Sequence, residues 1–86
     1  PVFRFLIKSS IFGTYSMSYD YLIISPCFNE NETVIEFLNS VDRIVGDTDH
    51  SFMVIIVDDA STDHTPELLK NFKMTSENVA FTILEL

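Results

Sequence analysis

Two short apolar runs, each followed at once by a polar cluster, constrain the fold of this chain more than any other feature. The first run, residues 21–24, ends at Ser25-Pro26. The second run, residues 52–57, ends at the acidic pair Asp58-Asp59. Continuous apolar runs of this length, rich in β-branched residues, are typical of strands that are buried on both faces of a parallel sheet. Because Pro26 has no N–H to donate, we expect strand pairing to end there.

The segment after the first run has the periodicity of an amphipathic helix. The apolar residues Val34, Leu38, Val41 and Val45 follow the spacing of one helix face. This spacing predicts a helix over residues 32–45. Gly46 then stands where a left-handed residue commonly ends a helix.

A second helix is expected after the second run. Thr65 is suited to the N-cap position, and Pro66 is suited to the first helical turn. Residues 79–84 have the composition of a third strand. The resulting order is β-α-β-α-β, which predicts a parallel, three-layer α/β unit of Rossmann-like type. Ligands bind such sheets beyond the carboxyl ends of the strands, where both polar clusters fall.

Charge and cysteine content exclude several classes of protein. Five Lys and Arg against 13 Asp and Glu give a net charge of -8, which argues against nucleic-acid binding. No window contains the roughly 18 consecutive apolar residues of a transmembrane helix. The single cysteine, Cys27, cannot form an internal disulfide and is expected to be a buried apolar residue. We therefore expect a cytoplasmic location.

Residues 1–18 are set apart from the regular pattern, and two interpretations of them stay open. In one, Met17 is the natural start and the preceding residues are an extension that is not native. In the other, they form an ordinary extra strand or helix that packs on the domain. Residues 19–86 are expected to be the N-terminal part of a truncated domain, because three strands and two helices leave sheet edges and faces uncovered.

The chemistry of the two clusters allows alternatives that stay open at this point. Asp58 and Asp59 either accept hydrogen bonds from a nucleobase or ribose, or are solvated turn residues. Because neighbouring strand residues point to opposite faces, one carboxylate can enter a ligand cleft while the other braces the loop. Phe28 either stacks on a base or packs under the helix. Asn29 and Glu30 are either ligand contacts or capping groups. His64 meets no metal-ligand spacing and is expected to lie in solvent.

Together, the segments Pro26-Cys27-Phe28-Asn29-Glu30 and Asp58-Asp59-Ala60-Ser61-Thr62-Asp63 resemble motifs of the family 2 glycosyltransferases, which have the GT-A fold. That family typically has a strand, a Pro-x-(Tyr/Phe)-Asn-Glu motif, a helix, a second strand and an Asp-Asp-x-Ser-x-Asp motif. The resemblance covers residues 19–86 and implies the N-terminal, nucleotide-binding half of a GT-A domain. With Thr33-Val34 following the first motif, the chain looks most like the polyprenyl-phosphate sugar transferases.

The resemblance also implies a role for individual residues. Pro26 matches the position that lines the nucleotide pocket, and Phe28 matches the aromatic residue that packs on the base. Glu30 matches a residue near the ribose of the sugar nucleotide. Asp59 matches the carboxylate that hydrogen-bonds the base, and Asp58 matches its neighbour in the same pocket.

The tail of the second motif is expected to shape its loop. Ser61 and Asp63 match positions whose side chains bond to nearby backbone groups. Ala60 stands where the family often has glycine, a departure that is not expected to disturb the loop.

Two parts of the family's machinery lie beyond the sequence matched here. They are the Asp-x-Asp motif that holds Mg²⁺ or Mn²⁺ and the carboxylate that activates the acceptor. The resemblance implies a parent enzyme that moves a sugar from a UDP- or GDP-sugar to a lipid-phosphate or glycan acceptor, in the cytoplasm or at the cytoplasmic face of a membrane. We expect the 86-residue chain alone to be inactive.

Two other functions are consistent with parts of the sequence. Residues 54–59 also look like the opening strand of a phospho-accepting receiver domain, in which Asp58 and Asp59 would bind Mg²⁺. A complete strand–helix unit precedes that strand here, whereas a receiver usually starts with it. A nucleotide-binding relic without catalytic activity is the other alternative.

Overall fold

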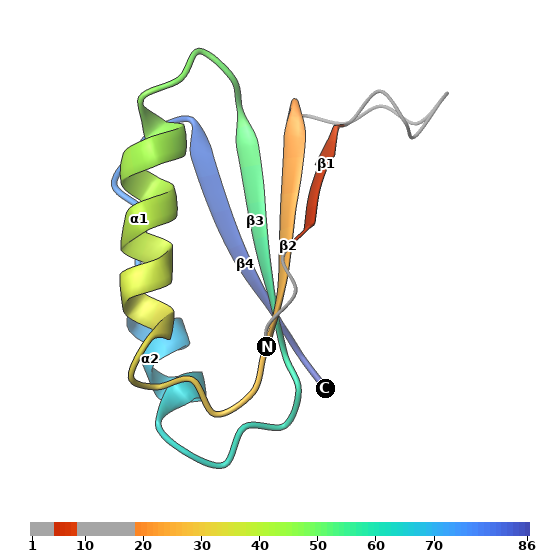
Figure 1. Cartoon of the computed structure of the whole chain (residues 1–86), viewed down its shortest axis with the longest axis vertical. Coiled ribbons are helices and arrows are strands. Elements are labelled where there is room, and N and C mark those ends of the chain that lie inside the picture. Colours follow the sequence, from red (N-terminus) through yellow and green to blue (C-terminus); the bar gives the residue numbers. More distant parts are fainter. Residues whose placement is uncertain (1–4, 9–18) are drawn as a thin grey trace.

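The computed structural model describes residues 5–8 and 19–86 of the chain, as two helices and four strands (Figure 1). The elements are β1 (Phe5–Lys8), β2 (Tyr21–Cys27), α1 (Val34–Gly46), β3 (Phe52–Asp58), α2 (Thr65–Asn71) and β4 (Val79–Glu85). The expected β-α-β-α-β order is therefore confirmed for β2 to β4. The proposed start at Met17 lies outside the described residues and stays a prediction.

The described strands form one sheet in the order β1-β2-β3-β4. β2, β3 and β4 are parallel, and their registers pair Cys27 with Asp58 and Asp58 with Glu85. β1 is antiparallel to β2 and pairs with it from Phe5 opposite Ile24 to Lys8 opposite Tyr21. The carboxyl ends of the three parallel strands therefore lie at one edge of the sheet.

Both helices cover the same face of the sheet (Figure 1). In the sheet, β2, β3 and β4 lie next to one another in the order in which they follow in the chain. Because β-α-β crossovers are right-handed, both connecting helices fall on the same face of the sheet. The described residues thus supply two layers of the expected three-layer unit, the helices and the sheet.

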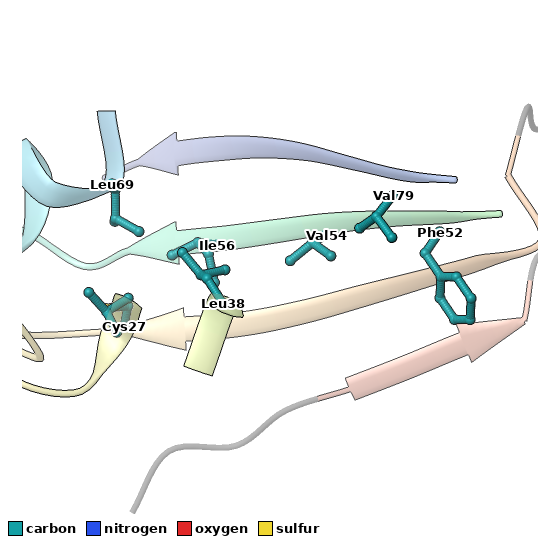
Figure 2. Close-up of a cluster of buried hydrophobic side chains, with 8 residues drawn as sticks. Cys27, Leu38, Phe52, Val54, Ile56, Leu69 and Val79 are labelled. Atoms are coloured by element: carbon teal, nitrogen blue, oxygen red, sulfur yellow. The ribbon is translucent and has the colours of Figure 1, made fainter. Parts of the chain in front are cut away.

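Burial along β3 alternates instead of being continuous. Phe52, Val54 and Ile56 are buried, whereas Met53 and Ile55 between them are only partly buried. The expectation of a strand buried on both faces is wrong for the described part, because the helices cover one face only. Figure 2 shows the core on that face. Its buried apolar residues are Cys27, Val34, Leu38, Phe52, Val54, Ile56, Leu69 and Val79.

Pro26 does not end the pairing of β2, contrary to expectation. The strand continues to Cys27, and Pro26 stays in register with Val57. The carbonyl of Cys27 accepts a hydrogen bond from the N–H of Asp59, so the backbone of Cys27 faces β3. Because neighbouring residues of a strand bond in opposite directions, Pro26 faces the side of β1, where the described pairing runs from Tyr21 to Ile24. Its missing N–H therefore breaks no bond to β3.

The helix ends differ from the sequence expectation at three residues. α1 begins at Val34 instead of residue 32. A turn precedes it, in which the carbonyl of Glu30 accepts the N–H groups of Thr33 and Val34.

Gly46 is the last residue of α1 and its φ lies outside the left-handed range. A Cβ at this position would lie 2.7 Å from Cβ of Ser76, so glycine is needed for close approach. Thr65 is the first residue of α2 instead of its N-cap.

A buried carboxylate that the sequence did not indicate joins α1 to the loop before β4. Asp42 is 6% exposed. Its carboxylate accepts hydrogen bonds from the N–H of Thr75 at 2.9 Å, the hydroxyl of Thr75 at 2.7 Å and the N–H of Ser76 at 3.0 Å. Burial alone would raise the pKa of Asp42, but the hydrogen bonds from Ser76 and Thr75 outweigh it and lower the pKa from 3.8 to about 2.

Replacement of this carboxylate is predicted to change how stability depends on pH. Because the folded-state pKa of Asp42 lies below its unfolded value, its stabilisation is present above about pH 4 and is lost as the pH falls toward about 2. Asp42→Asn should lower the free energy of unfolding by about 2 kcal/mol at neutral pH. The difference from wild type should shrink on acidification. Urea unfolding of the complete protein across this pH range measures both effects.

The exposed Asp49 supplies the matched control, since Asp49→Asn should leave the free energy of unfolding unchanged. A difference between wild type and Asp42→Asn that stays constant with pH would contradict the assigned role of the carboxylate.

Candidate functional site

Two loops leave the same edge of the sheet and lie side by side (Figure 1). The first loop, residues 28–33, joins β2 to α1. The second loop, residues 59–64, joins β3 to α2. Because Cys27 and Asp58 are opposite each other in parallel strands, the two loops begin at the same level of the sheet. All five residues predicted for the site belong to these loops or to the last residues of the two strands.

Hydrogen bonds from consecutive backbone groups join the two loops. Three N–H groups in a row in the first loop donate to side-chain oxygens that follow β3. The pairs are Asn29 N with Ser61 Oγ (3.0 Å), Glu30 N with Thr65 Oγ1 (2.9 Å) and Asn31 N with Asp63 Oδ2 (3.3 Å). The loops therefore form one connected unit, in which side chains of one loop satisfy the backbone of the other.

The acidic pair is split between the interior and the surface, as strand alternation predicts. Asp58 is buried, and Ser61 Oγ donates a hydrogen bond to its Oδ1. Its backbone carbonyl also accepts the N–H of Leu86 at 2.9 Å. Asp59 is exposed, and its backbone N–H donates to the carbonyl of Cys27 at 2.9 Å. Asp58 therefore braces the second loop, while the carboxylate of Asp59 is available to a ligand.

The first loop presents an aromatic ring to solvent. Phe28 is 57% exposed, which does not fit the alternative in which it packs under the helix. Pro26 and Glu30 are partly buried on either side of it in the sequence. Of the predicted site residues, Phe28 and Asp59 are thus the two that are exposed at this edge of the sheet.

Two of the motif residues shape the second loop, as expected. Ser61 links Asp58 to the first loop, as described above. Asp63 Oδ1 accepts the N–H of Thr65 at 2.9 Å, a side-chain to backbone bond that stabilises the start of α2. Burial alone would raise the pKa of Asp63, but the hydrogen bonds from Thr65 and Asn31 outweigh it and lower the pKa.

Ala60 has a backbone conformation that glycine adopts more readily than other residues. Its φ is 56°, in the left-handed region. For a residue with a Cβ, this region costs roughly 1–2 kcal/mol. Alanine therefore adopts this loop conformation at a small cost in stability.

Sequence reasoning missed the part that Thr65 plays. Thr65 is fully buried, and its hydroxyl accepts the N–H of Glu30, so it joins the start of α2 to the first loop. Its position before Pro66 indicated only a helix start. Among residues 5–8 and 19–86, no three His, Cys, Asp or Glu side chains are grouped closely enough to hold a metal ion.

The fold and the site together define a class of protein. A parallel α/β unit with two connected polar loops at the carboxyl ends of its first two parallel strands is typical of nucleotide-binding domains. Residues 22–85 match the model of the family described as glycosyl transferase family 2, and the chain belongs to this family. The resemblance noted from the two motifs is thereby confirmed at the level of the family. Comparison with curated proteins and with solved structures gave no match.

Removal of the hydroxyl that links Asp58 to the first loop is predicted to destabilise the protein. In Ser61→Ala, a buried carboxylate loses a donor and the N–H of Asn29 loses its acceptor. The loss in the free energy of unfolding should be about 1–3 kcal/mol. Urea unfolding of the complete protein measures it. The control is Ser40→Ala on α1, which should change stability by about 0.5 kcal/mol or less. Equal stability of Ser61→Ala and wild type would contradict the bracing role of Ser61.

Proposed function

We propose that the protein carrying this chain is a glycosyltransferase that binds the nucleotide of a UDP- or GDP-sugar at the two loops. It transfers the sugar to a lipid-phosphate or glycan acceptor. Membership of glycosyl transferase family 2 supports the reaction class. One observation supports the proposed location of the donor. Phe28 and Asp59 are both exposed, and they belong to two loops that are joined by hydrogen bonds.

The chemistry of these residues suits a nucleoside. The ring of Phe28 provides a flat apolar surface on which a base can stack. The carboxylate of Asp59 accepts hydrogen bonds from the N–H groups at the edge of a base. Pro26 lines the pocket, Glu30 lies near the ribose, and Asp58 supports the pocket from the buried side.

A divalent cation, Mg²⁺ or Mn²⁺, is part of this proposal for the complete protein. Such an ion stabilises the negative charge of the departing nucleoside diphosphate. The residues that the structure describes do not group enough ligands for it. From the resemblance to the family, we assign its ligands, and the carboxylate that activates the acceptor, to other parts of the protein. The 86-residue chain alone is expected to lack transferase activity.

The acceptor and the location follow from the subfamily proposed. The first motif, with Thr33 and Val34 after it, favours an enzyme of the polyprenyl-phosphate sugar transferase type. Such an enzyme acts at the cytoplasmic face of a membrane, where its lipid acceptor is held. No helix in the described ranges is long and apolar enough to cross a membrane. The receiver alternative gains no support from the family match.

Removal of the exposed carboxylate is predicted to weaken donor binding. In Asp59→Ala, the N–H group of a bound base loses its acceptor, and the loss of one partner of a buried hydrogen bond costs about 1–3 kcal/mol. The dissociation constant for UDP or GDP should rise about 5- to 150-fold. Calorimetric titration of the complete protein with each nucleotide, in the presence of Mn²⁺, measures this change.

The control is Asp49→Ala, an exposed carboxylate in the loop before β3, at the other edge of the sheet. This variant should bind as wild type does. Wild-type affinity in Asp59→Ala would show that the donor site is not at these loops.

A further inference from the structure

Asn29 makes more contacts between the two loops than any other residue in the described hydrogen bonds. Its Oδ1 accepts the N–H of Thr62 at 2.8 Å and the N–H of Asp63 at 3.3 Å. Its Nδ2 donates to the hydroxyl of Thr62 at 3.3 Å. With the bond from its own N–H to Ser61, one residue contacts three consecutive residues of the second loop.

The backbone of Asn29 is suited to this arrangement. Its φ of 48° lies in the left-handed region. Asparagine is among the residues other than glycine that adopt this conformation most readily. A short amide side chain that both accepts and donates hydrogen bonds is therefore combined here with a backbone conformation that few residues tolerate. Glycine at this position would keep the left-handed backbone and lose every side-chain hydrogen bond. A glycine variant therefore separates the contribution of the side chain from that of the backbone conformation.

The position of Asn29 relates these contacts to the proposed ligand. It follows Phe28 directly, and the residues that it contacts begin two positions after Asp59. Phe28 and Asp59 are exposed and belong to different loops, so their own side chains do not set the separation between them. The hydrogen bonds of Asn29 connect the two loops close to Phe28 and to Asp59.

We propose that Asn29 is a positioning residue for nucleotide binding, which holds the aromatic ring of Phe28 and the carboxylate of Asp59 at the separation that a stacked and hydrogen-bonded nucleoside requires. This inference rests on the proposed function. Asn29 itself need not touch the nucleotide. Its effect is to reduce the loop ordering that binding would otherwise require, which raises affinity.

The first test measures the loop contacts without any ligand. Asn29→Gly keeps the left-handed backbone but removes the acceptor for the N–H groups of Thr62 and Asp63. In the complete protein, amide hydrogen exchange of residues 62 and 63 should become about tenfold faster or more. Exchange of residues 54–57, in the centre of β3, should stay unchanged. Asn29→Asp keeps an acceptor at the same place and should restore slow exchange at both amides.

The second test measures binding. Calorimetric titration of the complete protein with UDP and with GDP should give a dissociation constant about tenfold higher for Asn29→Gly than for wild type. Asn29→Asp should fall between the two. The matched control is Asn39→Ala, which removes an exposed amide from α1 and should bind as wild type does.

The two tests separate the failure of this inference from that of the proposed function. If wild type binds a nucleotide and Asn29→Gly binds it equally well, the positioning role is wrong and the donor site stands. If wild type binds neither UDP nor GDP, the proposed function fails and the positioning role fails with it. If Asn29→Gly also speeds exchange in residues 54–57, the role of Asn29 is general stability, which overturns the inference.

Discussion

The parallel pairing of β2 with β3 is the constraint on which the rest of the structure depends. It places Cys27 opposite Asp58, so that both strands end at one edge and both following loops start there. An antiparallel pair would send the loops to opposite edges. Parallel pairing requires a long crossover, which α1 provides, and α1 in turn needs an apolar face such as that of Val34 and Leu38 to pack on the sheet. The candidate site is therefore a consequence of strand direction.

At this edge, hydrogen bonds between polar residues stabilise the loops, whereas apolar packing stabilises the core. Asp58 and Thr65 are buried, and each is hydrogen-bonded to a residue of the loops. A buried polar group that lacks a partner costs about 1–3 kcal/mol, so each such bond restricts the conformations that the loops can adopt. Phe28 and Asp59 are also exposed at this edge, but the hydrogen bonds described for the loops do not involve their side chains. In the proposed site, the side chains that stabilise the loops therefore differ from those proposed to contact the nucleotide.

Much of the fold was predictable from the sequence because it depends on local periodicity. The apolar run at residues 52–57 and the helical spacing from Val34 to Val45 indicated β3 and α1 within two residues of their ends. Features that depend on residues far apart were not predictable. The partners of Asp42 are 33 and 34 positions away, and Gly46 is required by contact with Ser76. The burial of one face of β3 followed from the position of both helices, which depends on the strand order and on the right-handed crossovers.

The sequence indicated where the two loops begin, but not the hydrogen bonds that join them. Strand alternation separated Asp58 from Asp59 correctly, but the contacts of Asn29 across the loops had no signal in the sequence. The most direct test of the donor site is photo-crosslinking of the complete protein with 5-azido-UDP and 8-azido-GDP, followed by peptide mapping. We predict that the label falls on residues 26–30 or 58–63 and that excess unmodified nucleotide removes it. Competable labelling confined to other segments, or none with either probe, would contradict the account.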